Sequence, residues 1–179
     1  MNLKLKRTPG LYLVGFMASG KSTVGRHRAH RMGWSFFDLD NEIEAAEKMT
    51  IAEIFTARGE AEFRRIEGEM LRNHVRWIEH GRPAVLALGG GAFTVEANRE
   101  LLSDRGITVW LDCPFDVVRC RVAEQHRGPV RPLAQDPLKF AALYDARRVH
   151  YQLADARVQI VSDDPEQTAT AILSHPGLK

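Results

Sequence analysis

Nine consecutive residues, from Gly15 to Thr23, constrain this chain more than any other part of it. They read Gly-Phe-Met-Ala-Ser-Gly-Lys-Ser-Thr and match the pattern G-x-x-x-x-G-K-[ST], in which a glycine-rich backbone turns its N–H groups toward a phosphate. An apolar run over residues 11–14 predicts a buried strand before the motif, and residues 21–32 can form a helix after it. A strand, this loop and a helix in that order predict a nucleotide-binding P-loop.

The residues of this motif have expected roles in binding the nucleotide. The glycines allow the backbone to fold tightly around a phosphate, and the following helix points the positive end of its dipole at the same anion. Lys21 is expected to reach the β- and γ-phosphates, and the Ser22 hydroxyl to bind Mg²⁺. The predicted nucleotide contacts are completed by the rest of the loop, namely Gly15, Ala18, Ser19, Gly20 and Thr23.

Composition and charge exclude several other classes of protein. The chain is 44% hydrophobic, as soluble globular proteins are, and its 25 basic and 23 acidic side chains leave a net charge of only +2. This balance argues against a general binder of nucleic acids or membrane surfaces. A basic cluster after the P-loop (Arg26, Arg28 and Arg31) is therefore interpreted as a solvated helix face. No run approaches the ~20 apolar residues of a membrane span.

The cysteines and the N-terminus favour a cytoplasmic protein. Cys113 and Cys120 lack the spacing of metal ligands and fit a reducing compartment. Residues 1–9 are basic but contain no apolar stretch long enough for a signal peptide. At 179 residues, we expect one domain that covers the whole chain.

Strand and helix patterns alternate along the chain. Strands are predicted at roughly 11–14, 34–37, 84–88, 107–111 and 156–161, and helices at 21–32, 41–57, 60–80, 96–105, 115–124, 137–154 and 165–174. Gly33 and Gly106 are expected to cap helices, and Asp136 to precede a helix that begins with Pro137. This alternation predicts an α/β fold with a parallel five-stranded sheet covered by helices on both faces. Ligands should bind where the strands end.

Polar residues and glycines gather at these predicted strand ends. Asp38 and Asp40 follow the second strand, and their carboxylates project to one side if the chain stays extended. Gly89-Gly90-Gly91 ends the third strand, and we favour a close approach to a ligand over a flexible turn. Arg147 shares a helix stripe with apolar residues, so its head either reaches water at the edge or points at a buried anion. Residues 125–133 form a loop of the kind that makes lids.

In this order, these segments resemble the shikimate kinases, which are small P-loop kinases of the nucleoside-monophosphate-kinase type. The resemblance runs from about residue 11 to residue 160. Beyond the P-loop it rests on Phe-x-Asp-x-Asp-x-x-Ile-Glu (36–44), Gly-Glu-x-x-Phe-Arg-x-x-Glu (59–67), Leu-Gly-Gly-Gly-Ala (88–92), Arg-Pro-Leu (131–133) and Arg-x-x-x-Tyr (147–151). The P-loop alone names only a superfamily, whereas the Asp pair, the Phe-Arg motif and the triple glycine together are specific.

The resemblance implies an activity and its acceptor site. It implies the P-loop NTPase fold, with a substrate-binding region at about 38–66 and a lid at about 122–136. It also implies transfer of the γ-phosphoryl group of ATP to the 3-hydroxyl of shikimate, a step in aromatic amino acid (chorismate) biosynthesis. Arg64 and Arg147 match the arginines that bind the carboxylate of shikimate, and Gly90 matches a backbone contact. Asp40 matches the carboxylate that binds the hydroxyls and is the candidate to orient and deprotonate the attacking oxygen.

The same resemblance implies the remaining donor-side roles. Asp38 would hold Mg²⁺ beside Ser22. Arg131 matches the lid arginine and, with Lys21 and Mg²⁺, would stabilise the charge of the transferring phosphoryl group. One role stays open, because adenine could stack on any of three arginines, namely Arg119, Arg121 and Arg127.

Two positions depart from the family pattern, and three other functions compete with this one. Ala18 stands where many members have glycine, and Arg28 stands where an apolar residue is usual, so the packing of the polar helix 21–32 is open.

The runner-up is another small-molecule P-loop kinase, such as a gluconate kinase, which would not need the three specific motifs. A catalytically dead nucleotide-binding module should lose Asp40 or the substrate arginines, and all are present. A nucleic-acid-binding ATPase is disfavoured by the near-neutral charge. We expect a monomer with no nucleic-acid or membrane partner.

Overall fold

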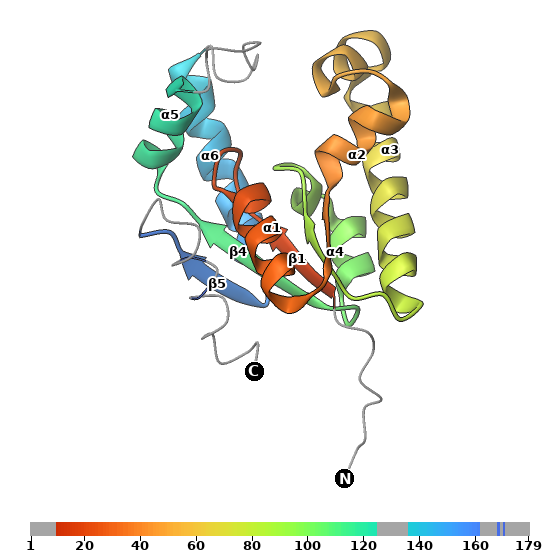
Figure 1. The fold of residues 1–179 in the computed structure, drawn as a ribbon. Coiled ribbons are helices and arrows are strands. Elements are labelled where there is room, and N and C mark those ends of the chain that lie inside the picture. Colours follow the sequence, from red (N-terminus) through yellow and green to blue (C-terminus); the bar gives the residue numbers. More distant parts are fainter. Residues whose placement is uncertain (1–9, 125–135, 162–167, 169, 171–179) are drawn as a thin grey trace.

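The computed structural model describes residues 10–124, 136–161, 168 and 170. Its centre is a five-stranded sheet with the strand order β2-β3-β1-β4-β5 (Figure 1). The strands are β1 (Gly10–Val14), β2 (Ser35–Asp38), β3 (Ala84–Ala87), β4 (Ile107–Asp112) and β5 (Ala156–Gln159). All neighbouring strands pair in parallel. The predicted α/β fold with a parallel five-stranded sheet is therefore confirmed.

Helices cover both faces of this sheet. They are α1 (Lys21–Met32), α2 (Leu39–Glu47), α3 (Ile51–Glu79), the short 3₁₀ helix η1 (Ala92–Thr94), α4 (Glu96–Leu102), α5 (Phe115–Glu124) and α6 (Pro137–Tyr151). In Figure 1, α1 crosses the near face, and α4 and α6 lie behind the sheet. The central strands β1 and β3 are buried along their whole length, which is why their sequences are continuously apolar rather than alternating. No described helix has the length and apolar character to cross a membrane.

Two of the three predicted helix boundaries are confirmed. Gly33 is left-handed and closes α1 by donating its N–H to backbone carbonyls of the last turn. The Asp136 side chain accepts from two backbone N–H groups at the start of α6, and Pro137 occupies the first helical position. The prediction for Gly106 was wrong, because α4 already ends at Leu102. A Cβ at Gly106 would strike the backbone of Gly10, so this glycine allows a close chain approach instead.

The segment between β2 and β3 breaks at two places, of which the sequence predicted one. The predicted break between 57 and 60 coincides with Gly59, whose non-helical backbone (φ 82°, ψ 168°) joins two helical parts of α3 across a kink. The second break was missed, because α2 ends at Glu47 and α3 begins at Ile51. The reason is a capping box in which Thr50 and Glu53 satisfy each other's backbone N–H groups, which starts a new helix there.

The polar helix α1 packs through small residues. A Cβ at Gly25 would lie 2.6 Å from the ring of Phe36 and 3.0 Å from Leu13, so glycine lets the helix approach the sheet closely. Arg28 is buried, and burial followed by the charge of Arg31 lowers its pKa. The interpretation of the basic cluster as a solvated face is thus wrong for Arg28, although Arg26 and Arg31 are exposed. The predicted lid at about 122–136 and the helix at 165–174 lie almost wholly outside the described residues.

Candidate active site

A cleft of about 1550 Å³ lies where the parallel strands end. The P-loop forms its floor, while residues of α2 and α3 line one side and residues of α5 line the other. Eleven of the residues predicted from the sequence line this cleft together: Ala18, Ser19, Gly20, Lys21, Ser22, Thr23, Asp38, Asp40, Arg64, Gly90 and Arg147. Gly15 lies in the same loop beneath them, and Arg131 lies outside the described residues.

The P-loop owes its shape to two glycines that no other residue could replace without strain. Gly15 has φ +145°, and a Cβ there would lie 2.8 Å from the carbonyl oxygen of Leu111. Gly20 has φ +92° and immediately precedes α1. The first turn of α1 lines the cleft, where its N–H groups, which precede the intrahelical hydrogen bonds, and the helix dipole favour an anion.

Ala18 adopts the same left-handed region with a side chain present. Its φ is +58°, a conformation that costs an L-residue roughly 1–2 kcal/mol. Its carbonyl oxygen accepts a hydrogen bond of 3.0 Å from Nη1 of Arg121 in α5. Many family members have glycine at this position, and glycine would adopt this φ without strain. The alanine of this chain therefore carries a strain that those members avoid.

Lys21 is buried at the floor of the cleft. Its Nζ donates to the carbonyl oxygens of Gly15 and Phe16, each at 2.9 Å. These dipoles hold the ammonium group inside the P-loop, where the motif requires a cation for the phosphates.

Ser22 and Asp38 meet beside the P-loop. The Ser22 hydroxyl donates to Oδ2 of Asp38, and Oδ1 of Asp38 accepts from the backbone N–H of Asn41 at 3.3 Å. A hydroxyl and a carboxylate are hard oxygen donors of the kind that suits Mg²⁺. The described residues contain no group of three or more His, Cys, Asp or Glu side chains that could hold a metal. This pair therefore suits an ion that takes its other ligands from phosphates and water, as Mg²⁺ commonly does.

Asp38 and Asp40 do not lie on one extended segment, which is the geometry considered in the prediction from the sequence. The chain turns into α2 at Leu39, so Asp38 caps the helix while Asp40 lies in its first turn. Both side chains nevertheless line the cleft. The turn separates their tasks, since Asp38 is tied to Ser22 and Asp40 faces the glycines after β3.

Each glycine of the triplet makes room for a different charged group. A Cβ at Gly89 would collide with the carboxylate of Asp40 and lie 2.9 Å from Oε1 of Glu67. At Gly90 it would lie 3.2 Å from Nη1 of Arg147, and at Gly91 it would lie 2.7 Å from Nη1 of Arg64. None of the three glycines has a positive φ, so the sequence needs them for space rather than for backbone freedom.

Acidic and basic side chains form one electrostatic group around these glycines. Nη1 of Arg64 donates to Oε2 of Glu67 at 2.7 Å, and Glu67 is only 1% exposed. Burial raises the pKa of Glu67, and the charge of Asp40 raises it further, while Arg64 and Arg147 act to lower it. The group thus combines two guanidiniums with two carboxylates, of which Glu67 is buried and the other three side chains are half-buried.

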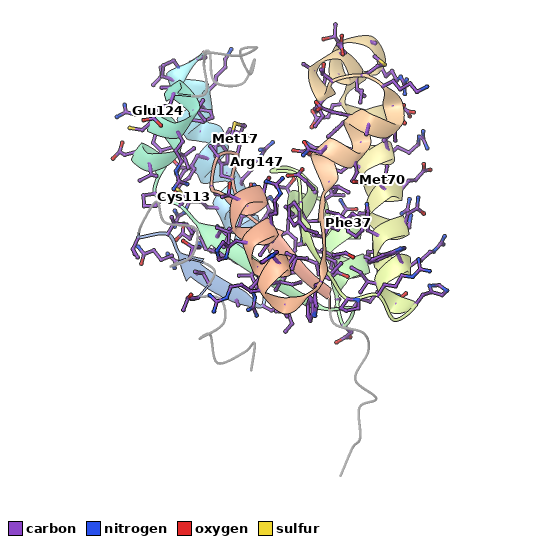
Figure 2. All side chains as sticks on the ribbon, in the orientation of Figure 1. Met17, Phe37, Met70, Cys113, Glu124 and Arg147 are labelled. Atoms are coloured by element: carbon purple, nitrogen blue, oxygen red, sulfur yellow. The ribbon has the colours of Figure 1, made fainter. Side chains whose placement is uncertain are left out.

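Arg147 points into the cleft rather than away from it. Its guanidinium lies 5.7 Å from the centre of the Phe16 ring, and a Cβ at Gly90 would be 3.2 Å from its Nη1. Figure 2 labels Arg147 near Met17 of the P-loop. The carbonyl of Gly90 accepts a hydrogen bond from Tyr151, one helical turn further along α6. Of the two positions left open for Arg147, the structure shows the inward one.

Comparisons with known proteins decide the family. The model of the family described as shikimate kinase matches residues 17–175. The chain belongs to the shikimate kinase family. A shikimate kinase of Ruegeria pomeroyi is 42% identical over 151 residues, which cover 84% of this chain and 74% of the relative. One of Cereibacter sphaeroides is 39% identical over 172 residues, covering 94% and 82%.

Solved structures agree with this assignment. The structure described as shikimate kinase from Acinetobacter baumannii in complex with shikimate matches with a TM-score of 0.83 at 37% identity. The match covers 92% of this chain and 90% of that one. The resemblance to shikimate kinases stated from the motifs is confirmed.

In this member of the shikimate kinase family, the structure adds Glu67 to the site and narrows the choice among the three candidate arginines for adenine. Glu67 was part of a quoted motif but received no role, although its position three residues after Arg64 on a helix predicts an ion pair. Arg121 lies against the P-loop, whereas Arg119 is 66% exposed at its side chain and pairs with Asp116. Arg127 lies outside the described residues. Arg121 is therefore the better placed of the two described candidates for the nucleotide.

Proposed function

We propose that this protein is a shikimate kinase that transfers the γ-phosphoryl group of ATP to the 3-hydroxyl of shikimate, giving shikimate 3-phosphate and ADP. The observation that carries the proposal is the acceptor set: Asp40, Arg64, Gly90 and Arg147 face the P-loop across one cleft. Shikimate is a small carboxylate with three hydroxyls. The set offers it two guanidiniums, one carboxylate and an approachable backbone, all lining the same cleft as the P-loop.

The two arginines bind the carboxylate of shikimate. Each charge-assisted hydrogen bond contributes about 1.5–3 kcal/mol. Glu67 holds the Arg64 guanidinium by its 2.7 Å hydrogen bond, so this cation is oriented before the substrate arrives. Because Gly90 has no side chain, the ring of the substrate can approach the backbone between the two guanidiniums.

Asp40 orients the attacking hydroxyl and accepts its proton. A bond forms between the 3-oxygen of shikimate and the γ-phosphorus, and the bond from that phosphorus to the β–γ bridging oxygen breaks. ADP leaves with the electron pair of the broken bond. Negative charge spreads over the transferring phosphoryl group, and the ammonium of Lys21 stabilises it together with the helix N-terminus. Arg131, assigned by its motif alone, adds a further cation from the lid.

Ser22 and Asp38 are the residues that would hold Mg²⁺. The ion would neutralise charge on the β- and γ-phosphates. Arg121 contributes to binding of the nucleotide from α5. The lid is assigned to residues 122–136 because the family's Arg-Pro-Leu motif (131–133) falls in this segment, which joins α5 to α6.

We also propose that the enzyme acts as a monomeric single domain in the cytoplasm, without a nucleic-acid or membrane partner. Both sides of the cleft come from one chain, which supports a site complete without a second copy. Cys113 and Cys120 are not joined in a disulfide, which supports a reducing compartment. Size-exclusion chromatography with light scattering tests the monomer directly.

The proposed reaction is tested by measuring ADP release from MgATP with shikimate and, in parallel, with gluconate. Shikimate-dependent turnover is expected, and gluconate should give no more than the background. Turnover with gluconate alone would favour the sugar-acid kinase instead. Purified Lys21→Ala protein, prepared identically, controls for a contaminating ATPase.

A further inference from the structure

An ionic cluster around the buried Asp112 lies at the end of β4, outside the set of residues assigned to the reaction. Asp112 is the last residue of β4, and its side chain is 6% exposed. It accepts from Arg148 of α6, with Nη1–Oδ1 at 3.0 Å and Nη2–Oδ2 at 3.4 Å. It also accepts from Arg157 of β5, with Nε–Oδ2 at 2.9 Å. One carboxylate therefore holds two guanidiniums.

An indole ring fixes the same two cations from the other side. Trp110 lies two residues before Asp112, so both side chains project from one face of β4. The guanidinium carbon of Arg148 lies 5.1 Å from the ring centre, and that of Arg157 lies 4.9 Å from it. Within residues 10–124 and 136–161, Asp112 is the only carboxylate paired with either arginine. The acid and the ring together determine where both guanidiniums lie.

Arg148 ties α6 to the chain segment after β4 by a second route. Its Nη1 donates to the hydroxyl of Tyr144 at 2.8 Å, and that hydroxyl donates to the carbonyl oxygen of Cys113 at 2.7 Å. Arg148 and Tyr144 are one turn apart on the same face of α6. This face of the helix is thus bound to the end of β4 through two side chains, which restrains rotation of the helix about its axis.

The residue before Arg148 is the proposed substrate ligand Arg147. Neighbouring side chains on an α-helix are about 100° apart around the axis, so the direction of one sets the direction of the other. While Arg148 faces Asp112, Arg147 faces Gly90 and the Phe16 ring.

We propose that Arg148 is a positioning residue that acts through Arg147. Its pairing with Asp112 fixes the rotation of α6 and thereby holds the Arg147 guanidinium where the carboxylate of the acceptor binds. The inference rests on the proposed function, because it takes Arg147 as the ligand of that carboxylate.

Arg157 provides a matched control. It binds the same carboxylate and lies over the same ring, but it belongs to β5, and its side chain is 56% exposed. Replacing either arginine removes one cation from Asp112, and both replacements are expected to lower thermal stability. Only Arg148 is on the helix that carries Arg147. A fall in melting temperature therefore does not distinguish the two, whereas substrate binding does.

The first test compares steady-state kinetics of Arg148→Met and Arg157→Met with wild type. Arg148→Met should raise the KM for shikimate about tenfold while kcat and the KM for ATP stay within about twofold, because uniform binding of the acceptor is lost. Arg157→Met should leave all three within about twofold. An equal rise of the KM for shikimate in both variants would show general loosening and would overturn the proposal.

The second test asks whether Arg148 acts through Arg147. The KM for shikimate and its dissociation constant from calorimetry are measured for Arg147→Met, Arg148→Met and the double variant. If the proposal holds, adding Arg148→Met to Arg147→Met causes no further loss. If the loss of shikimate binding in the double variant equals the product of the losses in the two single variants, the arginines act independently and the proposal is overturned. Arg148→Lys retains the charge and replaces Arg148→Met in the same cycle if the latter does not fold.

The wild-type measurement separates this inference from the proposed function. A wild type without shikimate-dependent turnover or binding refutes the proposed function itself. A wild type that turns over shikimate, combined with independent effects of the two arginines, refutes only the role of Arg148.

Discussion

The residues on the P-loop side of the cleft are neighbours in the sequence, whereas those on the acceptor side come from four separate segments. Residues 15–23 form the P-loop side as the loop after β1 and the first turn of α1. On the acceptor side, Asp40 comes from α2, Arg64 from α3, Gly90 from the segment after β3 and Arg147 from α6. A phosphate cradle can be made by local backbone geometry, but a pocket for a shaped organic acid needs groups that converge from several directions.

The two sides also differ in their electrostatics. Lys21 is held by backbone carbonyls, so the P-loop side has a cation set among dipoles. On the acceptor side, guanidiniums and carboxylates alternate around the buried Glu67. Changes at the P-loop should therefore act on phosphoryl transfer to any acceptor, and changes on the other side should act on one substrate. The following predictions are ordered from the largest expected effect to the smallest.

Lys21→Ala should abolish phosphoryl transfer to every acceptor. The cation stabilises charge in the transition state, and we expect kcat to fall by about 10³–10⁵-fold, as for other cations at this position of the reaction. Calorimetric binding of shikimate should be unchanged, since the acceptor side does not involve Lys21. A Lys21→Ala variant with nearly wild-type kcat would contradict the view that the P-loop side acts on phosphoryl transfer itself.

Arg64→Met should affect the acceptor alone. The variant keeps the stem of the side chain, whose guanidinium lies over the Phe63 ring, but removes the charge. The KM for shikimate should rise about 10- to 100-fold, with the KM for ATP unchanged, as expected for loss of one or two charge-assisted hydrogen bonds.

The neighbouring Arg65 is the matched control for this prediction. It is exposed and pairs with Glu62 and Glu69 outside the cleft, so Arg65→Met should change both KM values less than about twofold. Equal effects of the two substitutions would argue against a carboxylate site at Arg64.

Glu67→Gln should change how the stability of the protein depends on pH. Burial raises the pKa of Glu67, so the folded state keeps this proton to a higher pH than the unfolded chain does. The stability contributed by this group is fully present below the ordinary carboxyl pKa and is lost as pH rises through the raised pKa.

Glutamine does not titrate, so the free energy of unfolding of Glu67→Gln minus that of wild type should increase between about pH 4 and pH 8. Urea unfolding at several pH values measures this difference. A difference that stays constant or decreases with pH would show that the pair with Arg64, rather than burial, dominates at Glu67.

Ala18→Gly should have the smallest effect, and it falls on the P-loop side. Glycine relieves the left-handed strain at φ +58° but increases the entropy of the unfolded chain, so the net gain in stability should be below about 1 kcal/mol. Thermal unfolding measures the gain, and kcat should stay within about twofold. A large loss of activity would mean that the methyl group, not the backbone, shapes the loop.

Much of the fold follows from local patterns. The P-loop, the strands around the sheet and the boundaries of α1 and α6 were predictable because glycine caps, proline positions and apolar runs act over a few residues. The break between α2 and α3 was also local, and the Thr50–Glu53 capping box could have located it. The orientation of Arg147 and the burial of Arg28 could not be predicted from local patterns. Both depend on which elements pack against α6 and α1, respectively.

The sequence by itself determined the P-loop with its Lys21 and Ser22, the alternating α/β order and, through its combined motifs, the family. Only the tertiary structure decided that each glycine after β3 lies against a different charged side chain, that Glu67 is buried beside Arg64, and that Arg148 pairs with Asp112. The physical reason is distance along the chain. Dihedral preferences and caps act between near neighbours, whereas pockets and buried ion pairs join residues that become neighbours only when the sheet assembles.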